Sequence, residues 1–347
     1  MIGAGLRVLV AGELWWGSTL RACAGALRRH GCVVSTVDEW QYLPQATSLA
    51  LKVLCRLAER WQIDGYNEAI LRACERFQVD VFFTVKGNYI QERTVRALGE
   101  RGVTTVNFYP DTSARTHRAL EFESLRAYRV FFVAKGFQAA DARGWGVAEP
   151  IFIPHGYDAE VHRELAGFGA AKAPEVCFVA NRTAHKEELL DAAIREWPEM
   201  PLRIYGGGWG MARISEGIRS RWEGWAPAGD AYAEVLQRYL INLAILSGKV
   251  DGASQGDETT TRTFEVPACA GFMLHERTPE VLTLFREGEE IGCFDGAREL
   301  VEKVQWHLAH RAETEAMAAR GRARCVPAYS CDARVGEMLG RIRGAGR

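Results

Sequence analysis

The stretch from residue 175 to residue 208 reads EVCFVANRTAHKEELLDAAIREWPEMPLRIYGGG, and its pattern decides the fold. Glu175–Ala180 is a short apolar run of the kind that is buried on both faces of a sheet. Glu187–Trp197 has the length of a helix, and Leu202–Tyr205 is a second apolar run that closes on Gly206-Gly207-Gly208. A helix between two buried strands crosses over the sheet, so the strands lie parallel. This segment therefore predicts a βαβ unit of an α/β protein.

The same alternation of apolar strands and helices runs through most of the chain. It predicts two Rossmann-like, doubly wound domains that face each other across a cleft, with ligands at the carboxyl ends of the strands. We expect domains over residues 1–154 and 155–330, followed by a C-terminal helix within 331–347. Two separate helices are expected near 51–58 and 70–77. The other expected strands are Leu6–Ala11, Cys32–Val37, Val79–Val85, Thr104–Tyr109, Arg129–Ala134, Ile151–Pro154, Ile241–Leu246, Phe272–His275 and Ile291–Phe294.

Composition limits the classes of protein to consider. The 347 residues are 48% hydrophobic, and 43 Lys and Arg oppose 44 Asp and Glu, for a formal net charge of -1. This balance favours packed globular domains and argues against a protein that coats nucleic acid, which needs a surplus of positive charge. No apolar run has the ~20 residues of a membrane span, and no signal peptide is evident. The nine cysteines follow no disulfide or metal spacing, so we expect a cytoplasmic protein with no metal site. We also expect no cofactor.

The densest polar cluster is Asp257-Glu258-Thr259-Thr260-Thr261-Arg262-Thr263-Phe264-Glu265, at the start of a predicted helix. A helix start offers backbone N–H groups to an anion, and a carboxylate nearby can accept hydrogen bonds from a sugar diol. Asp257 and Glu265 are therefore candidate functional acids. The alternative is helix capping, with Thr260, Thr261 and Thr263 as caps.

A basic pair follows the strand that ends at Ala180. Arg182 and Lys186 lie four positions apart at a strand-to-helix junction, where they are suited to neutralise a diphosphate. The alternative is an exposed helix start with solvated cations. Gly207 and Gly208 end a strand, where backbone can approach a ligand closely, although a plain loop is the more frequent explanation.

The first half of the chain supplies further candidates. Trp15 and Trp16 lie in the loop from Gly12 to Gly17, and one of them is a candidate for stacking on a sugar; packing against the next helix is the alternative. His155 is a candidate base or hydrogen-bonding group, and Asp111 ends another strand. The alternatives are that His155, a lone His before a Gly turn, is structural, and that Asp111, a single Asp after Pro, is a turn residue.

Taken together, the sequence resembles the CgeB-type spore-maturation glycosyltransferase-like proteins, within the wider GT-B glycosyltransferases. The resemblance covers most of the chain and is strongest from Glu175 onward; the most specific segment is Thr260–Cys269. The other segments that carry it are VKGNYI (85–90), NFYPD (107–111), IPHGYD (153–158) with VHR (161–163), and RIYGGGW (203–209).

The resemblance implies a GT-B architecture and a hexosyltransferase-like enzyme that uses a nucleoside-diphosphate sugar, with UDP as the expected nucleotide. It implies that Glu265 binds the ribose, that Asp257 contacts the donor sugar, and that Arg182 and Lys186 bind the diphosphate. It also implies that the final helix crosses back onto the first domain. The remaining implied nucleotide-sugar residues are Gly207, Gly208, Trp225, Thr260, Thr261 and Arg262, and the implied acceptor-side residues are Gly12, Trp15, Trp16, Gly17, Lys86 and Asn88.

The expected reaction is metal-independent transfer to an acceptor hydroxyl with retention of configuration, and Asp257, Glu265, Asp111 and His155 are the candidate catalytic residues. If the enzyme inverts instead, Asp111 is the candidate base. Two alternatives remain open at this point. One is an epimerase or hydrolase of sugar nucleotides on the same fold, and the other is a catalytically silent binder of nucleotide or glycan in surface-polysaccharide assembly. The acceptor is not identified.

Overall fold

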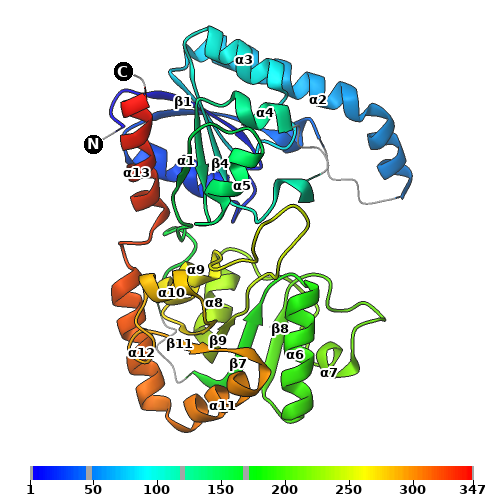
Figure 1. Cartoon of the computed structure of the whole chain (residues 1–347), viewed down its shortest axis with the longest axis vertical. Coiled ribbons are helices and arrows are strands. Elements are labelled where there is room, and N and C mark those ends of the chain that lie inside the picture. Colours follow the sequence, from blue (N-terminus) through cyan, green and yellow to red (C-terminus); the bar gives the residue numbers. More distant parts are fainter. Residues whose placement is uncertain (1–2, 44–48, 118–121, 167–171, 346–347) are drawn as a thin grey trace. The chain divides into compact units, whose positions relative to one another are not determined.

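The computed structural model describes residues 3–43, 49–117, 122–166 and 172–345. The chain divides into two compact units, and each contains one parallel sheet (Figure 1). Unit 1 comprises residues 1–154, 250–254 and 331–347, and unit 2 comprises residues 155–249 and 255–330. The prediction of an α/β protein with parallel sheets is confirmed.

The six-stranded sheet of unit 1 has the order β2-β1-β3-β4-β5-β6. Its strands are β1 (Arg7–Gly12), β2 (Val33–Asp38), β3 (Val81–Val85), β4 (Thr104–Tyr109), β5 (Val130–Val133) and β6 (Pro150–Phe152). The helices are α1 (Thr19–Arg29), α2 (Leu49–Phe77), α3 (Glu92–Glu100), α4 (Phe122–Ala127), α5 (Gln138–Gly144) and α13 (Cys331–Ala345), with 3-10 turns η1 (Glu39–Gln41) and η2 (Ala114–Thr116).

Strand β1 shows why this sheet is covered on both faces. Successive side chains of a strand point to opposite faces. Val8 and Val10 lie in the core that α1 and α13 cover, whereas Leu9 and Ala11 lie in the core on the α2 side. All four are essentially inaccessible to solvent. A continuous apolar run is therefore what this position in the fold requires.

The five-stranded sheet of unit 2 has the order β11-β10-β9-β7-β8. Its strands are β7 (Ala173–Val179), β8 (Leu202–Tyr205), β9 (Tyr239–Ala244), β10 (Phe272–Glu276) and β11 (Gly292–Phe294). The helices are α6 (Ala184–Glu196), α7 (Glu216–Arg219), α8 (Asp230–Arg238), α9 (Arg262–Ala268), α10 (Pro279–Leu284), α11 (Gly296–Ala309) and α12 (Arg311–Cys325).

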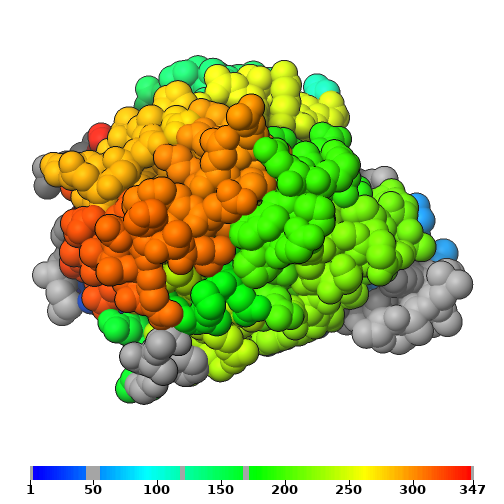
Figure 2. All heavy atoms as spheres, turned by 90° about the horizontal axis from the view of Figure 1, so that it is seen from below, coloured from blue at the N-terminus to red at the C-terminus, as the bar shows by residue number. Residues whose placement is uncertain are grey.

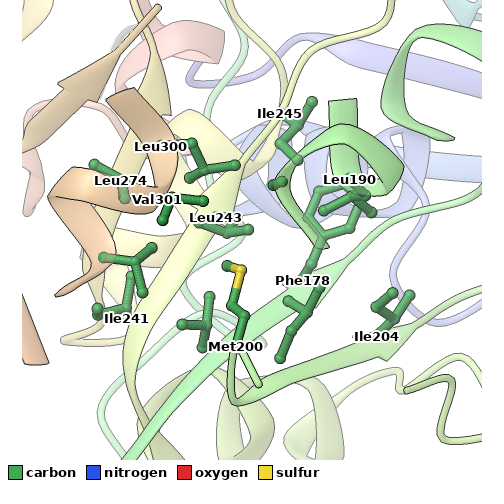
Figure 3. Close-up of a cluster of buried hydrophobic side chains, with 14 of the residues drawn as sticks. Phe178, Leu190, Met200, Ile204, Ile241, Leu243, Ile245, Leu274, Leu300 and Val301 are labelled. Atoms are coloured by element: carbon green, nitrogen blue, oxygen red, sulfur yellow. The ribbon is translucent and has the colours of Figure 1, made fainter. Parts of the chain in front are cut away.

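Helices α6 and α11 pack together over one face of this sheet. Figure 3 shows Leu190 of α6 and Leu300 of α11 facing Ile241 and Leu243 of β9. In the space-filling view of Figure 2, the residues of α11 (orange) lie beside those of α6 (green). This core holds the carboxyl edge of the sheet, from which the loops described below emerge.

The structure differs from the sequence-based expectation in its short or irregular helices. The two helices expected near 51–58 and 70–77 are one 29-residue helix, α2. Its middle breaks the apolar spacing, because Leu57 and Trp61 face solvent at 79% and 81% exposure. Helices α4, α5 and α7 were not predicted, since four to seven residues are too few to show a periodic pattern. Among the described residues, no helix is both long and apolar enough to cross a membrane.

Candidate functional site

The carboxyl edge of the unit 2 sheet gathers charged residues from three adjacent strands. Strands β7, β9 and β10 are neighbours and parallel, so the loops that follow them leave the sheet at the same edge. Lys186 follows β7, Asp257 and Arg262 follow β9, and Glu276 ends β10. Three of these four were predicted from sequence as ligand-binding residues.

Lys186 is the most unusual residue of this edge, because its side chain is a buried cation. It is only 5% exposed, in the first turn of α6, whose cap Thr183 accepts a hydrogen bond from the Lys186 N–H. Its Nζ donates to the carbonyl of Asn181 at 3.2 Å. Burial, together with the nearby guanidinium of Arg262, lowers the pKa of Lys186 to about 7. A cation so short of negative partners is suited to receive an anionic ligand.

Two acids offset part of this positive charge. Asp257 and Glu276 both act to raise the pKa of Lys186, but burial and Arg262 outweigh them. Glu276 is already engaged, since it accepts from the backbone N–H of Leu246 at 3.0 Å and lies 2.7 Å from Nε2 of His185. The hydrogen bond to Glu276 raises the pKa of His185.

Arg182, the predicted partner of Lys186, is occupied elsewhere. Its guanidinium forms an ion pair with Glu187 in the first turn of α6. A diphosphate would have to compete with Glu187 for this residue. The cation beside Lys186 is instead Arg262, which also appeared among the predicted nucleotide-sugar residues but not as part of the basic pair.

Arg262 begins α9 and is held by backbone and by an aromatic ring. Its Nη2 donates to the carbonyl of Ile245 at 2.8 Å, and its guanidinium lies 5.7 Å from the centre of the Phe178 ring. Its buried Nε and the buried hydroxyl of Thr260 have no hydrogen-bond partner among the residues that the structure describes. Buried polar groups are usually paired, so these two unsatisfied groups are consistent with a site that a ligand completes.

The threonines at the start of α9 were predicted either to bind a ligand or to cap the helix. Thr261 occupies the N-cap position, but its side chain makes no capping hydrogen bond. Thr263 accepts from the backbone N–H of Thr260 at 3.0 Å, and its hydroxyl lies 2.9 Å from Nε2 of His275. Burial lowers the pKa of His275 to about 4, so this histidine is neutral near pH 7. The Thr263 hydroxyl thus links α9 to the residue before its N-cap, and among the described residues no side chain caps this helix.

Glu265 belongs to a small polar cluster of its own. The hydroxyl of Tyr232 donates to Oε2 of Glu265 at 2.6 Å, and Nε2 of His162 lies 3.6 Å from Oε1. The Nδ1 atom of His162 accepts from the backbone N–H of Asp158, which leaves Nε2 to face the acid. The Glu265 side chain is 14% exposed, so its position is well defined while part of the carboxylate stays accessible.

The glycines after β8 have a packing reason within the chain. A Cβ at Gly206 would lie 2.1 Å from the carbonyl oxygen of Ala180, and Gly206 has a φ of +116°. Gly207 N–H donates to the side chain of Asn181, and a Cβ at Gly208 would lie 3.1 Å from that of Arg182. The close approach inferred from sequence is therefore an approach to the loop after β7. This contact fixes the backbone that leads into Lys186.

Two other predicted residues of unit 2 lie outside these contacts. The carbonyl of Trp225 accepts from Gly206 N–H at 2.9 Å, while the ring is 46% exposed and lies edge-on to Tyr205. This backbone carbonyl is thus already used. His155 is 5% exposed, so a ligand has little access to its ring.

In unit 1, Asp111 lies at the carboxyl end of β4 in a network of ion pairs. Its Oδ2 is 2.9 Å from Nζ of Lys86 and 2.6 Å from Nε2 of His117. Burial alone would raise the pKa of Asp111, but the His117 hydrogen bond and the Lys86 ammonium hold it well below its usual range. A carboxylate with so low a pKa is a weak base. The geometry therefore favours a structural role for Asp111, through these ion pairs, over the general-base role predicted for it.

The predicted acceptor-side residues separate into two groups. Trp15, Gly17, Lys86 and Asn88 line one pocket of about 120 Å³. Trp16 does not line it and stacks instead under the guanidinium of Arg21, 3.5 Å from the ring centre. Gly12 is buried at the end of β1, where a Cβ would meet Leu20 at 2.7 Å. Of the tryptophan pair, only Trp15 is thus placed to contact a ligand in this pocket.

A match to a known protein family covers much of unit 2. Residues 182–340 match the family described as glycosyl transferase-like. This region is therefore similar to glycosyl transferase-like proteins. The match includes Lys186, Arg262, Glu265 and the glycine-rich loop after β8. It confirms the prediction of a glycosyltransferase at the level of the domain, and it does not resolve the CgeB-type subfamily. No curated protein matches the chain by sequence.

Solved structures match the whole chain. A sucrose-phosphate synthase from Thermosynechococcus elongatus superposes with a TM-score of 0.70 at 15% identity, over 98% of each chain. A glycosyltransferase from Rickettsia africae does so with a TM-score of 0.66 at 8% identity, over 98% of this chain and 99% of that one. Anabaena HepE in complex with UDP-glucose gives 0.63 at 12% identity, over 98% and 100%. The predicted GT-B fold is confirmed.

Sequence analysis missed several residues that the structure places beside predicted ones. In unit 2 these are Tyr232, His162 and Glu276, and in unit 1 they are Glu39 and His117. A signal existed for Glu276, because it directly follows the predicted strand Phe272–His275 at the ligand-binding edge. Tyr232 approaches Glu265 from 33 residues away, and no spacing rule reveals such a contact. Within the described ranges, no group of three or more His, Cys, Asp or Glu is arranged to hold a metal.

Proposed function

We propose that this protein transfers a sugar from a nucleoside-diphosphate sugar, with UDP as the nucleotide, to an acceptor hydroxyl. The observation that carries the proposal is the buried ammonium of Lys186 beside Arg262 at the carboxyl edge of the unit 2 sheet. The glycosyl transferase-like match over this region supports it, as does the fold shared with a protein solved with UDP-glucose. The resemblance of Thr260–Cys269 to the CgeB-type proteins supports a place in that subfamily.

The proposed roles follow from charge. Breaking the bond between sugar and diphosphate builds negative charge on the leaving phosphate, and Lys186 and Arg262 stabilise that charge. Glu265 accepts hydrogen bonds from the ribose hydroxyls, and the Tyr232 hydroxyl keeps its carboxylate oriented. Asp257 contacts the donor sugar near Lys186. Arg182 contributes once the diphosphate has displaced Glu187.

We further propose that transfer retains configuration and uses no metal. Two protein cations at the leaving group supply the electrostatic stabilisation that a metal ion supplies in other transferases. In a retaining front-face reaction the departing phosphate takes the acceptor proton, so no strong protein base is needed. This agrees with the weak basicity of Asp111.

Nucleotide binding tests the proposal directly. We expect UDP at ~100 times its Kd to stabilise the wild-type protein against thermal unfolding by about 2.7 kcal/mol. At the same concentration, GDP and dTDP are expected to stabilise it less. Glu265→Ala is expected to weaken UDP binding about 10- to 100-fold, since hydrogen bonds to charged groups contribute ~1.5–3 kcal/mol. Glu196→Ala removes an exposed carboxylate at the end of α6 and is the matched control.

The measurement is a thermal-shift screen followed by calorimetric titration. If no nucleotide binds the folded wild type, the transferase proposal fails. If UDP-glucose is consumed at full rate without any acceptor, the protein is a hydrolase or epimerase. Binding without turnover against a broad set of acceptors would favour the silent binder.

Donor affinity is also expected to depend on pH through Lys186. The free protein holds Lys186 charged below its pKa of about 7, and the diphosphate binds the charged form. Affinity therefore falls as pH rises, by about tenfold from pH 6 to pH 8 for a single group with this pKa. Calorimetry with UDP-glucose is the suitable measurement, because its doubly esterified diphosphate keeps a constant charge over this range. In Lys186→Met the slope disappears; an equal slope in that variant would assign the effect to another group, such as His185.

A further inference from the structure

A second candidate site lies in unit 1, in the pocket of about 120 Å³ that Trp15 and Asn88 line. We name it the Glu39 pocket, after the buried acid in its wall. The loop after β1 supplies Glu13 and Trp15, η1 supplies Glu39, and the loop after β3 supplies Lys86 and Asn88. Sites for whole drug-sized ligands have ~300 Å³ or more. This pocket therefore fits one end of a ligand, such as a single functional group and the carbons that carry it.

Glu39 is a buried carboxylate for which the structure describes no hydrogen bond and no ion pair. It is 7% exposed, so more than nine-tenths of the residue is removed from solvent. Its neighbour Asp38 caps η1 by accepting from the backbone N–H of Trp40, which leaves Glu39 as an acid of the pocket wall without a capping role. An unpaired buried carboxylate is costly for a fold to keep. Its position in a pocket wall indicates that the compensating partner is a ligand.

The charge of the pocket selects the kind of ligand. Lys86 is the cation of the lining, but its Nζ is paired with Asp111 at 2.9 Å. Glu13 and Glu39 are both carboxylates, and the charge of Glu13 opposes ionisation of Glu39. Lys86 also attracts Glu13 and Glu39 over a longer range, but its ion pair is with Asp111, so these two acids of the wall have no ion pair among the described residues. The pocket thus repels anions and attracts a cation.

We propose that the Glu39 pocket binds the protonated primary amine of an amine-bearing sugar or polyol. The ammonium lies between the carboxylates of Glu39 and Glu13, and the exposed ring of Trp15 covers the carbons that carry it. Binding of the amine stands on this geometry alone; its identification as the end of the acceptor rests on the proposed transferase function. The amine is the recognised group, and a hydroxyl elsewhere on the same molecule receives the sugar.

Ionisation of Glu39 gives the pocket a pH dependence. Burial and the neighbouring carboxylates of Glu13 and Asp38 raise the pKa of Glu39 to about 7, and Lys86 opposes this increase. Tyr66 of α2 and Tyr89 of the loop before α3 also face this charge; their own pKa values are raised, chiefly by burial, so both stay neutral. An alkyl amine stays protonated up to ~10. Amine binding therefore strengthens as pH rises from 6 to 8.

The test compares glucamine (1-amino-1-deoxysorbitol) with sorbitol, which has a hydroxyl in place of the amine. Calorimetric or NMR titration of the full chain at pH 8 is expected to show glucamine binding about tenfold or more tighter than sorbitol. Glu39→Gln keeps the shape of the side chain and removes its charge, so it is expected to abolish this preference. Glu100→Gln, an exposed acid at the end of α3, is the control and is expected to keep it.

Sorbitol binding as tightly as glucamine, or an unchanged preference in Glu39→Gln, would overturn the proposal. Urea unfolding followed by circular dichroism shows whether the variant is folded, because UDP, whose proposed residues lie in unit 2, would not report on unit 1. The two proposals fail separately. If glucamine binds and UDP does not, the amine site stands and the transferase function falls; if UDP binds and glucamine does not, the reverse holds.

Discussion

We expect Lys186→Met to lower kcat/KM for the sugar donor about 100- to 1000-fold, the loss typical when one electrostatic stabiliser of the transition state is removed. The residue acts on the leaving diphosphate, so kcat falls as well as donor affinity. Methionine is close to lysine in length and is apolar, so it fills the same buried space without the charge. The measurement is steady-state kinetics with UDP-glucose once an acceptor is in hand, and UDP calorimetry before that.

The same variant is expected to be at least as stable as the wild type. Lys186 has a pKa lowered to about 7 in the fold, chiefly by burial, whereas an unfolded lysine titrates near ~10.4. Between these values the unfolded chain binds more protons, so wild-type stability falls as pH decreases toward 7. The gain in Lys186→Met is therefore complete below pH 7 and fades toward pH 10. Lys303→Met, on α11, is the matched control and is expected to change neither activity nor this pH profile. A variant that lost stability and activity together would show that Lys186 supports the fold instead.

Gly206→Ala is the second change with a large expected effect. A Cβ at this position would lie 2.1 Å from the carbonyl oxygen of Ala180, a distance at which backbone must move. The φ of +116° adds strain for any residue with a side chain. We expect the free energy of unfolding to fall by about 3 kcal/mol or more. Urea unfolding measures this loss.

Gly224→Ala separates the two causes. Gly224 also has a positive φ, +82°, but a Cβ there would meet no atom within 4 Å. We expect it to cost only the backbone strain, about 1–2 kcal/mol. Equal losses in the two variants would show that the contact with Ala180 is unimportant. Because the same contact positions the loop that leads into Lys186, Gly206→Ala is also expected to weaken UDP binding at temperatures where it remains folded.

The strands were predictable because a strand that is buried on both faces of a sheet is a continuous apolar run in the sequence. β4 and β8 occupy the residues that their apolar runs indicate, Thr104–Tyr109 and Leu202–Tyr205. Helices depend on a periodic face, and α2 lacks a continuous one, since Leu57 and Trp61 are exposed. Its single continuous helix could not be recognised from that pattern.

The candidate site was predictable where it follows from topology. Parallel strands bring their carboxyl ends to one edge, which is why the loops that follow β7 and β9 could be expected to share a ligand, whereas Arg262 itself was implied by the family resemblance. Pairings that depend on side-chain direction could not be foreseen. The ion pair of Arg182 with Glu187 is one of these. The burial of Glu39, whose carboxylate has no ion pair with any described residue, could not be foreseen either. Sequence reports which groups are present, but packing decides which of them remain available.

The return of the chain to unit 1 has a consequence for biosynthesis. Val335, Met338, Leu339 and Ile342 of α13 complete the core that begins with α1, so unit 1 lacks part of its interior until those residues emerge from the ribosome. Residues 155–330 are translated before that moment and contain their own core. Unit 2 can therefore reach its native state while the first 154 residues still expose the apolar face of α1. A nascent chain arrested before residue 331 should bind chaperones through residues 1–154, although these are translated first and have the longest time to fold.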